Sequence, residues 1–404
     1  MTKAVARRTA RQSLAAIRLT TPRPPWRRIV AGTAALILVL AASAVGSTLA
    51  HLHLPAPTGE YAVGRARTVL ADESRGERNT TSESDLRRLR IVAWYPAIAG
   101  TGTPAAYVED LYAIGDGLVA SGSIGEFELS GLGLVTTSSR SGAEVADSSG
   151  GHPVVVLSPG NATNVDFYGS LAEDLASHGF VVIGIDHPYQ SAAVALGDTV
   201  AVYAGDPPLS EAADVVTARI EQRVADIGFV LDRLAADGAG FADLDRQLDL
   251  DRVGVIGHSN GGLAAVEVCD DPRVHACVNL DGQNQGGPFG TRTDSSAPAN
   301  PFLFMTKETD LHPALADVFE AGGTGGFRVV VPAAEHDSFT DGALFRPRLL
   351  PTDGLAEHVT TITRGFTLAF LEHTLADGPR SAFGDVDART DVQVFVYPLV
   401  RSAE

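Results

Sequence analysis

Short apolar runs alternate with helix-like segments from residue 153 onward. Residues 153–158 (PVVVLS) and 180–185 (FVVIGI) are almost continuously apolar, which is typical of strands buried on both faces of a parallel sheet. Residues 210–234 carry apolar side chains at helical spacing, and residues 357–375 predict a closing helix. Further strands are expected at 90–95, 252–256, 276–280, 301–306 and 328–331. This alternation predicts an α/β fold with a mostly parallel central sheet flanked by helices.

The N-terminal 50 residues have a different pattern. Residues 1–28 contain eight basic side chains and no acidic one, and the 22 residues 29–50 carry no charge. A helix of that length spans about 33 Å, enough to cross a bilayer. The basic flank predicts a cytoplasmic tail at 1–28, a transmembrane anchor at 29–50 and a body outside the cell. A cleaved signal segment, which would release the body, is the alternative.

The rest of the chain reads as one domain behind a linker. Residues 51–85 are polar with weak periodicity and predict a linker, and residues 86–404 predict the globular domain. Beyond residue 28 the chain has 49 acidic and 23 basic residues, a balance of −26, so this body lacks the positive footprint that nucleic acids need. Cys269 and Cys277 are the two cysteines; in an exported chain they can form a disulfide, or they remain separate buried thiols. Because no Cys/His spacing is typical of a metal site, we expect neither metal nor cofactor.

The pentapeptide Gly257-His258-Ser259-Asn260-Gly261 matches the pattern G-x-S-x-G. A predicted strand leads directly into it and a predicted helix follows. A serine on such a sharp turn points into the crevice above the carboxyl edge of the sheet, and the two flanking glycines, Gly257 and Gly261, form its elbow by relieving the crowding there. We therefore predict that Ser259 is a nucleophile, with a helix-capping serine as the ordinary alternative.

A serine hydroxyl needs a base to remove its proton, and the imidazole needs a carboxylate to fix its tautomer. His336 follows a predicted strand in a position from which a loop can return to the elbow, and His312 is its competitor. Asp281 and Asp310 each follow a predicted strand, and both keep the order serine, acid, histidine that is typical of α/β-hydrolases. Spacing alone leaves Asp281 and Asp310 as alternatives.

A tetrahedral intermediate also needs two preorganised N–H donors for its oxyanion. We expect one from the backbone of Asn260, next to the nucleophile. The other is expected from the backbone of Asn161, in the loop after the predicted strand 153–158, where Gly160 permits a close approach.

Several runs together resemble the platelet-activating-factor acetylhydrolase family of α/β-hydrolases. They are LRIVAWYP at 89–96, LSPG at 157–160, LASHGFVV at 175–182, GHSNGG at 257–262 and HDSF at 336–339. Bacterial cutinases and polyester hydrolases share several of these runs. The resemblance spans residues 86–375 and implies an α/β-hydrolase fold for the globular domain.

The resemblance also bears on the acid and on the substrate. In acetylhydrolase-like members the acid follows the strand immediately after the nucleophile helix, which implies Asp281, whereas a cutinase-like arrangement implies Asp310. The loop at 158–161 reads Ser-Pro-Gly-Asn instead of the Ser-His-Gly form common among acetylhydrolases. This departure counts against a phospholipid substrate.

These features together predict a serine carboxylic-ester hydrolase that works through an acyl-enzyme. Short acyl esters of lipids and other small-molecule esters are the candidate substrates, and the N-terminal segment is the expected contact with a membrane. Polyesterase, peptidase and thioesterase activities with the same triad are alternatives. A membrane-tethered binding protein on a disabled hydrolase scaffold is the alternative of another class. Nothing in the sequence indicates an oligomeric state.

Overall fold

The computed structural model describes most of the chain beyond its N-terminal segment. The described residues are 53–206, 211–236, 238–282, 298, 300–307, 325–332, 334–345, 354–376 and 392–397. The predicted tail at 1–28 and the predicted anchor or signal segment at 29–50 therefore lie outside the described residues. No helix within the described ranges is long and apolar enough to cross a bilayer.

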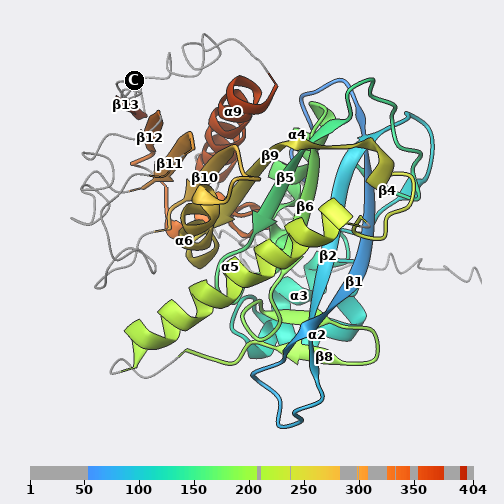
Figure 1. The fold of residues 1–404 in the computed structure, drawn as a ribbon, viewed down its shortest axis with the longest axis vertical. Coiled ribbons are helices and arrows are strands. Elements are labelled where there is room, and N and C mark those ends of the chain that lie inside the picture. Colours follow the sequence, from blue (N-terminus) through green and yellow to red (C-terminus); the bar gives the residue numbers. More distant parts are fainter. Residues whose placement is uncertain are drawn as a thin grey trace, which may run out of the picture. The chain divides into compact units, whose positions relative to one another are not determined.

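A single large sheet organises the domain (Figure 1). Its order is β13-β12-β11-β10-β9-β5-β6-β2-β1-β4-β3, and β7 pairs separately with β8. The strands are β1 (Ala62–Gly76), β2 (Leu86–Ala97), β3 (Thr103–Pro104), β4 (Ser139–Ser141), β5 (His152–Ser158), β6 (Val181–Asp186), β7 (Ala193–Ala195), β8 (Val200–Val202), β9 (Leu248–His258), β10 (Ala276–Leu280), β11 (Phe302–Thr306), β12 (Gly326–Val330) and β13 (Gln393–Tyr397). The helices are α2 (Leu111–Ala120), α3 (Glu126–Leu132), α4 (Gly169–Ser177), α5 (Ala212–Ala236), α6 (Asn260–Glu267), α8 (Gly342–Phe345) and α9 (Leu355–Leu375), with short 3₁₀ turns η1 (Val165–Tyr168), η2 (Asp245–Gln247), η3 (Val268–Asp270) and η4 (His336–Phe339).

The centre of the sheet is parallel, as predicted. Strands β6, β5, β9, β10, β11 and β12 run in one direction, and β2 and β13 join its two sides antiparallel. The chain goes from β5 to its neighbour β6 and then returns to place β9 on the other side of β5. Ligands of open α/β sheets bind at such a reversal of strand order, outside the carboxyl ends of the strands. The ends of β5 and β9 therefore mark the place where a site is expected.

Helices cover both faces of the sheet, which explains its apolar strands. Every residue of β5 is buried, and its side chains alternate between two core clusters: Val155 and Leu157 in one, Val154 and Val156 in the other. The first cluster includes side chains of α4 and α9, and the second includes those of α5 and α6. In Figure 1, α5 crosses one face of the sheet.

The predicted linker at 51–85 is wrong over much of its length. Residues Ala62–Gly76 form β1, which pairs antiparallel with β2 over most of its length. Because β1 contains several charged side chains, its hydropathy pattern does not predict a buried strand. Arg65 of β1 is buried, and its charge is compensated there by an ion pair with Asp166.

Two features that the sequence left open are decided by the structure. Cys269 and Cys277 form a disulfide that joins η3, the turn directly after α6, to β10, with 5.9 Å between their Cα atoms. The segment between β2 and β5 contains the two short helices α2 and α3.

Candidate active site

Ser259 lies at the sharp turn between β9 and α6. Its backbone has φ 53° and ψ −123°, a conformation that costs a non-glycine residue about 1–3 kcal/mol. Neighbouring contacts hold it there: the Ser259 N–H donates to the carbonyl of Leu280 at the end of β10 (3.0 Å), and the Ser259 carbonyl accepts from the Leu263 N–H in α6 (3.1 Å). The side chain is half-buried. The strained turn thus places its hydroxyl at the carboxyl edge of the sheet, as the G-x-S-x-G motif predicts.

The glycines of the motif are explained by the crowding around this turn. A Cβ atom on Gly257 would lie 1.9 Å from the carbonyl oxygen of Gly261. A Cβ atom on Gly261 would lie 2.2 Å from the carbonyl oxygen of Ser158. Both distances are far below van der Waals contact and both involve backbone atoms, so no larger residue fits without moving the strand or the helix.

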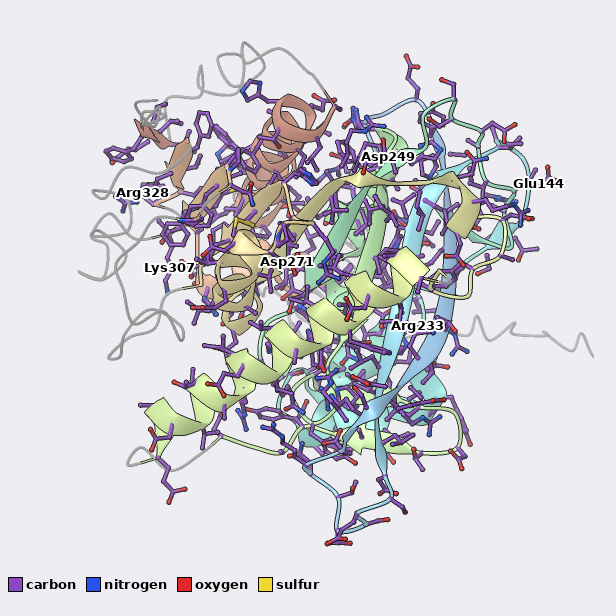
Figure 2. All side chains as sticks on the ribbon, viewed as in Figure 1. Glu144, Arg233, Asp249, Asp271, Lys307 and Arg328 are labelled. Atoms are coloured by element: carbon purple, nitrogen blue, oxygen red, sulfur yellow. A yellow bond between two sulfur atoms is a disulfide. The ribbon has the colours of Figure 1, made fainter. Side chains whose placement is uncertain are left out.

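His336 and Asp281 form a hydrogen-bonded pair. The distance from His336 Nδ1 to Asp281 Oδ2 is 2.7 Å. Asp281 directly follows β10 and its side chain is 3% exposed, whereas that of His336 is 42% exposed. The other oxygen, Oδ1, accepts from the Thr306 hydroxyl (3.0 Å) and from the Lys307 N–H (3.4 Å), at the end of β11 where Figure 2 labels Lys307. The competing residues Asp310 and His312 lie outside the described residues.

His258, next to the predicted nucleophile, links the loop that carries His336 to the loop after β5. Its Nε2–H donates to the backbone carbonyl of His336 (3.0 Å), so its Nδ1 accepts from the hydroxyl of Tyr168 (2.8 Å). The same hydroxyl accepts from the Gly160 N–H (2.9 Å). Burial lowers the pKa of His258 to about 3, so the imidazole stays neutral and keeps this tautomer. The ring centroids of His258 and His336 are 4.7 Å apart, which places His336 beside the elbow.

This linking role of His258 and Tyr168 has no signal in the sequence. A histidine at the second position of the motif was visible, but its partners are 90 and 78 residues away along the chain. No local pattern predicts such contacts.

The loop after β5 approaches Ser259 closely. A Cβ atom on Gly160 would lie 3.4 Å from the Cβ atom of Ser259. Pro159 has no N–H, the Gly160 N–H is bound by Tyr168, and the Ala162 N–H donates to a backbone carbonyl of the next loop (2.7 Å). Within the described part of the chain, the Asn161 N–H has no such partner. Across the turn, Asn260 is the first residue of α6, where N–H groups have no partner inside the helix.

The described side chains contain no group of three or more histidine, cysteine, aspartate or glutamate residues that could hold a metal ion.

Comparisons with known proteins indicate the class of enzyme. Residues 47–310 match the family described as platelet-activating factor acetylhydrolase, isoform II. The chain is 29% identical over 289 residues to a probable 1-alkyl-2-acetylglycerophosphocholine esterase of Arthroderma benhamiae, covering 68% of this chain and 70% of that protein. It is also similar to the solved structure of a ferulic acid esterase from Streptomyces cinnamoneus, with a TM-score of 0.68 and 27% identity, covering 85% of this chain and 98% of the other.

The family match covers more than half of the 404 residues, and the relative and the solved structure are both esterases by description. This sets aside the alternative of a non-catalytic binding protein. The chain belongs to the isoform II family of platelet-activating factor acetylhydrolases and is an esterase.

Proposed function

We propose that this esterase cleaves carboxylic esters with Ser259 as nucleophile, His336 as general base and Asp281 as the acid that orients the histidine. The observation that carries this proposal is the 2.7 Å hydrogen bond between His336 Nδ1 and the buried Asp281, next to a serine held at positive φ. An ionised Asp281 keeps the proton of His336 on Nδ1, so that Nε2 is free to accept the proton of Ser259.

The reaction then follows from these groups. Ser259 Oγ attacks the ester carbonyl carbon while His336 takes its proton, and the N–H groups of Asn260 and Asn161 receive the negative oxygen. His336 returns the proton to the departing alcohol, which leaves an acyl-enzyme on Ser259. Water, deprotonated by the same histidine, attacks the acyl-enzyme and releases the acid.

We propose a short acyl ester of a lipid as the substrate. The family and the fungal relative support this, because the latter is described as an esterase of an acetylated glycerophosphocholine. An aromatic ester is a second candidate, supported by the similarity to a ferulic acid esterase. The Ser-Pro-Gly-Asn loop at 158–161 counts against a phospholipid, so the lipid ester has to be tested directly against the aromatic one.

The test is turnover by the full chain, purified in detergent, on a panel of esters. The panel contains p-nitrophenyl acetate, butyrate and octanoate, a 1-alkyl-2-acetylglycerophosphocholine and methyl ferulate. We expect Ser259→Ala to lower kcat at least about 10⁴-fold on every substrate turned over. Ser130→Ala, at an exposed serine of α3, serves as the matched control. Full activity in Ser259→Ala would refute the mechanism, and preference for methyl ferulate over the acetylated lipid would refute the substrate.

We also propose that residues 29–50 anchor the esterase in the cell membrane with its catalytic domain outside. This rests on the sequence of the segment and its basic flank alone. An anchored protein stays with membranes after extraction at alkaline pH and keeps its N-terminus. A shortened chain in the medium would show instead that the segment is a cleaved signal.

A further inference from the structure

A second Ser-His-Asp arrangement lies beneath the loop after β5. The distance from Ser158 Oγ to His187 Nε2 is 3.0 Å, and the distance from His187 Nδ1 to Asp226 Oδ2 is 2.9 Å. All three residues are fully buried. Because no substrate can reach Ser158, these residues do not form a second active site, and another role must account for them.

The protons of this chain of hydrogen bonds can be assigned. Burial opposes the ionisation of Asp226, but the attraction of Arg87, whose guanidinium binds both carboxylate oxygens, holds the pKa of Asp226 well below its usual range. Burial, together with the nearby Arg223, lowers the pKa of His187 to about 4. A neutral His187 therefore donates from Nδ1 to the carboxylate and accepts at Nε2 from the hydroxyl of Ser158.

Arg223 of α5 binds the same loop from below. It is fully buried. Its Nη1 donates to the carbonyl of Pro159 (2.6 Å) and to Ser158 Oγ (3.4 Å), and its Nη2 donates to the carbonyl of Gly160 (3.3 Å). Its Nε donates to the side chain of Gln190 (2.8 Å). One guanidinium thus binds three consecutive residues, the last of β5 and the first two of the loop that follows it.

The contact with Gly160 fixes the direction of the next N–H group. The carbonyl of Gly160 and the N–H of Asn161 belong to one planar peptide unit, in which a trans bond points them in opposite directions. Since the carbonyl points at Arg223, the Asn161 N–H points away from it. Gly160 is also the residue whose Cβ position lies 3.4 Å from the Cβ atom of Ser259, so this peptide unit lies at the nucleophile.

We propose that Arg223, supported by the hydrogen-bonded chain Ser158–His187–Asp226, is a positioning residue that holds the Asn161 N–H toward the oxyanion formed at Ser259. This rests on the proposed function of Ser259. This role explains the buried charge of Arg223. Among the described residues no carboxylate forms an ion pair with its guanidinium, and an unpaired charge is costly in a protein interior. Its hydrogen bonds instead orient a backbone group of the proposed oxyanion site.

Arg223→Lys tests the proposal. An ammonium group is a point charge and cannot reproduce the planar fork that spans two carbonyls and a hydroxyl. We expect kcat for p-nitrophenyl acetate to fall by about 10²-fold, as for the loss of one oxyanion donor, while KM changes by less than about threefold, since the ground-state ester needs this N–H little.

A tetrahedral probe separates positioning from general damage. An alkyl trifluoromethyl ketone forms a bond from its carbonyl carbon to Ser259 Oγ while the serine proton passes to His336, which leaves a negative oxygen that needs the same N–H groups. Its inhibition constant should rise in Arg223→Lys by the same factor by which kcat falls.

The matched control is Arg364→Lys in α9. Arg364 is also buried and also donates to two backbone carbonyls, those of Pro55 and Ala56, besides its ion pair with Asp174. Arg364→Lys should lower the melting temperature but leave kcat and the affinity for the ketone within about twofold of the unmodified esterase.

Ser158→Ala is the second variant. It removes a single hydroxyl, so it tests the positioning role even if Arg223→Lys does not fold. It should lower kcat and the affinity for the ketone together, by about tenfold. The proposal is overturned if the folded variants keep both quantities at the level of Arg364→Lys. Measuring Ser259→Ala in parallel separates the two failures: activity that persists in Ser259→Ala refutes the proposed function, whereas its loss there leaves only the positioning role refuted.

Discussion

Replacing Asp281 by asparagine changes one atom of the side chain but reverses the proton arrangement at His336. Oδ1 of Asp281 accepts from the Thr306 hydroxyl and the Lys307 N–H. The backbone N–H can only donate, so an asparagine here keeps its carbonyl oxygen at this position. Its NH₂ group then takes the place of Oδ2, which lies 2.7 Å from His336 Nδ1. Nδ1 must then accept, and the proton of His336 moves to Nε2.

A histidine in that tautomer cannot accept the proton of Ser259. In serine proteases such a change lowers kcat by about 10⁴-fold, which corresponds to about 5.5 kcal/mol of activation free energy. We expect the same magnitude for Asp281→Asn on p-nitrophenyl acetate. The melting temperature should change by only a few degrees, because each side-chain atom keeps a hydrogen-bonding partner.

The assay is steady-state turnover of the full chain at pH 8 with Asp310→Asn as the matched comparison. Asp310 is the alternative acid, and its substitution should leave kcat within about threefold. The reasoning is wrong if Asp281→Asn keeps more than a tenth of the activity while it remains folded. A large loss in Asp310→Asn alone would assign the acid to Asp310.

Two further predictions concern stability. Removing the disulfide by Cys269→Ser with Cys277→Ser should lower the free energy of unfolding by about 2.5 kcal/mol in the chain-entropy model for a short loop, measured by denaturant titration; an unchanged midpoint would mean that the bond does not form. Burial raises the pKa of Asp341 from 3.8 to about 7, so between these values the native state holds a proton that the unfolded chain has released. Stability should therefore fall as the pH rises from about 4 to about 7, and Asp341→Asn should flatten this part of the curve; an equal slope in the variant would contradict the assignment.

The sequence by itself determined the parallel sheet and the elbow. Strands buried on both faces need continuous apolar runs such as VVVL in β5, so hydropathy reveals them directly. The turn at Ser259 needs glycine at 257 and 261 because backbone oxygens occupy the space of a Cβ atom. This requirement is visible in the sequence as a local motif. The sequence also predicted His336, which follows the strand at 328–331. Chain order limits which loops can reach the serine at the carboxyl edge of the sheet.

Only the tertiary structure decided which charged and polar groups meet. Charged side chains hide β1 from a hydropathy pattern, because its buried Arg65 is matched by Asp166 about a hundred residues away in sequence. Spacing did not choose between Asp281 and Asp310, and the hydrogen bond from His336 to Asp281 depends on how neighbouring strands align. The hydrogen bonds from Arg223 to residues 158–160 also join residues more than sixty positions apart. Such pairings follow from the order of strands in space, and no local periodicity encodes that order.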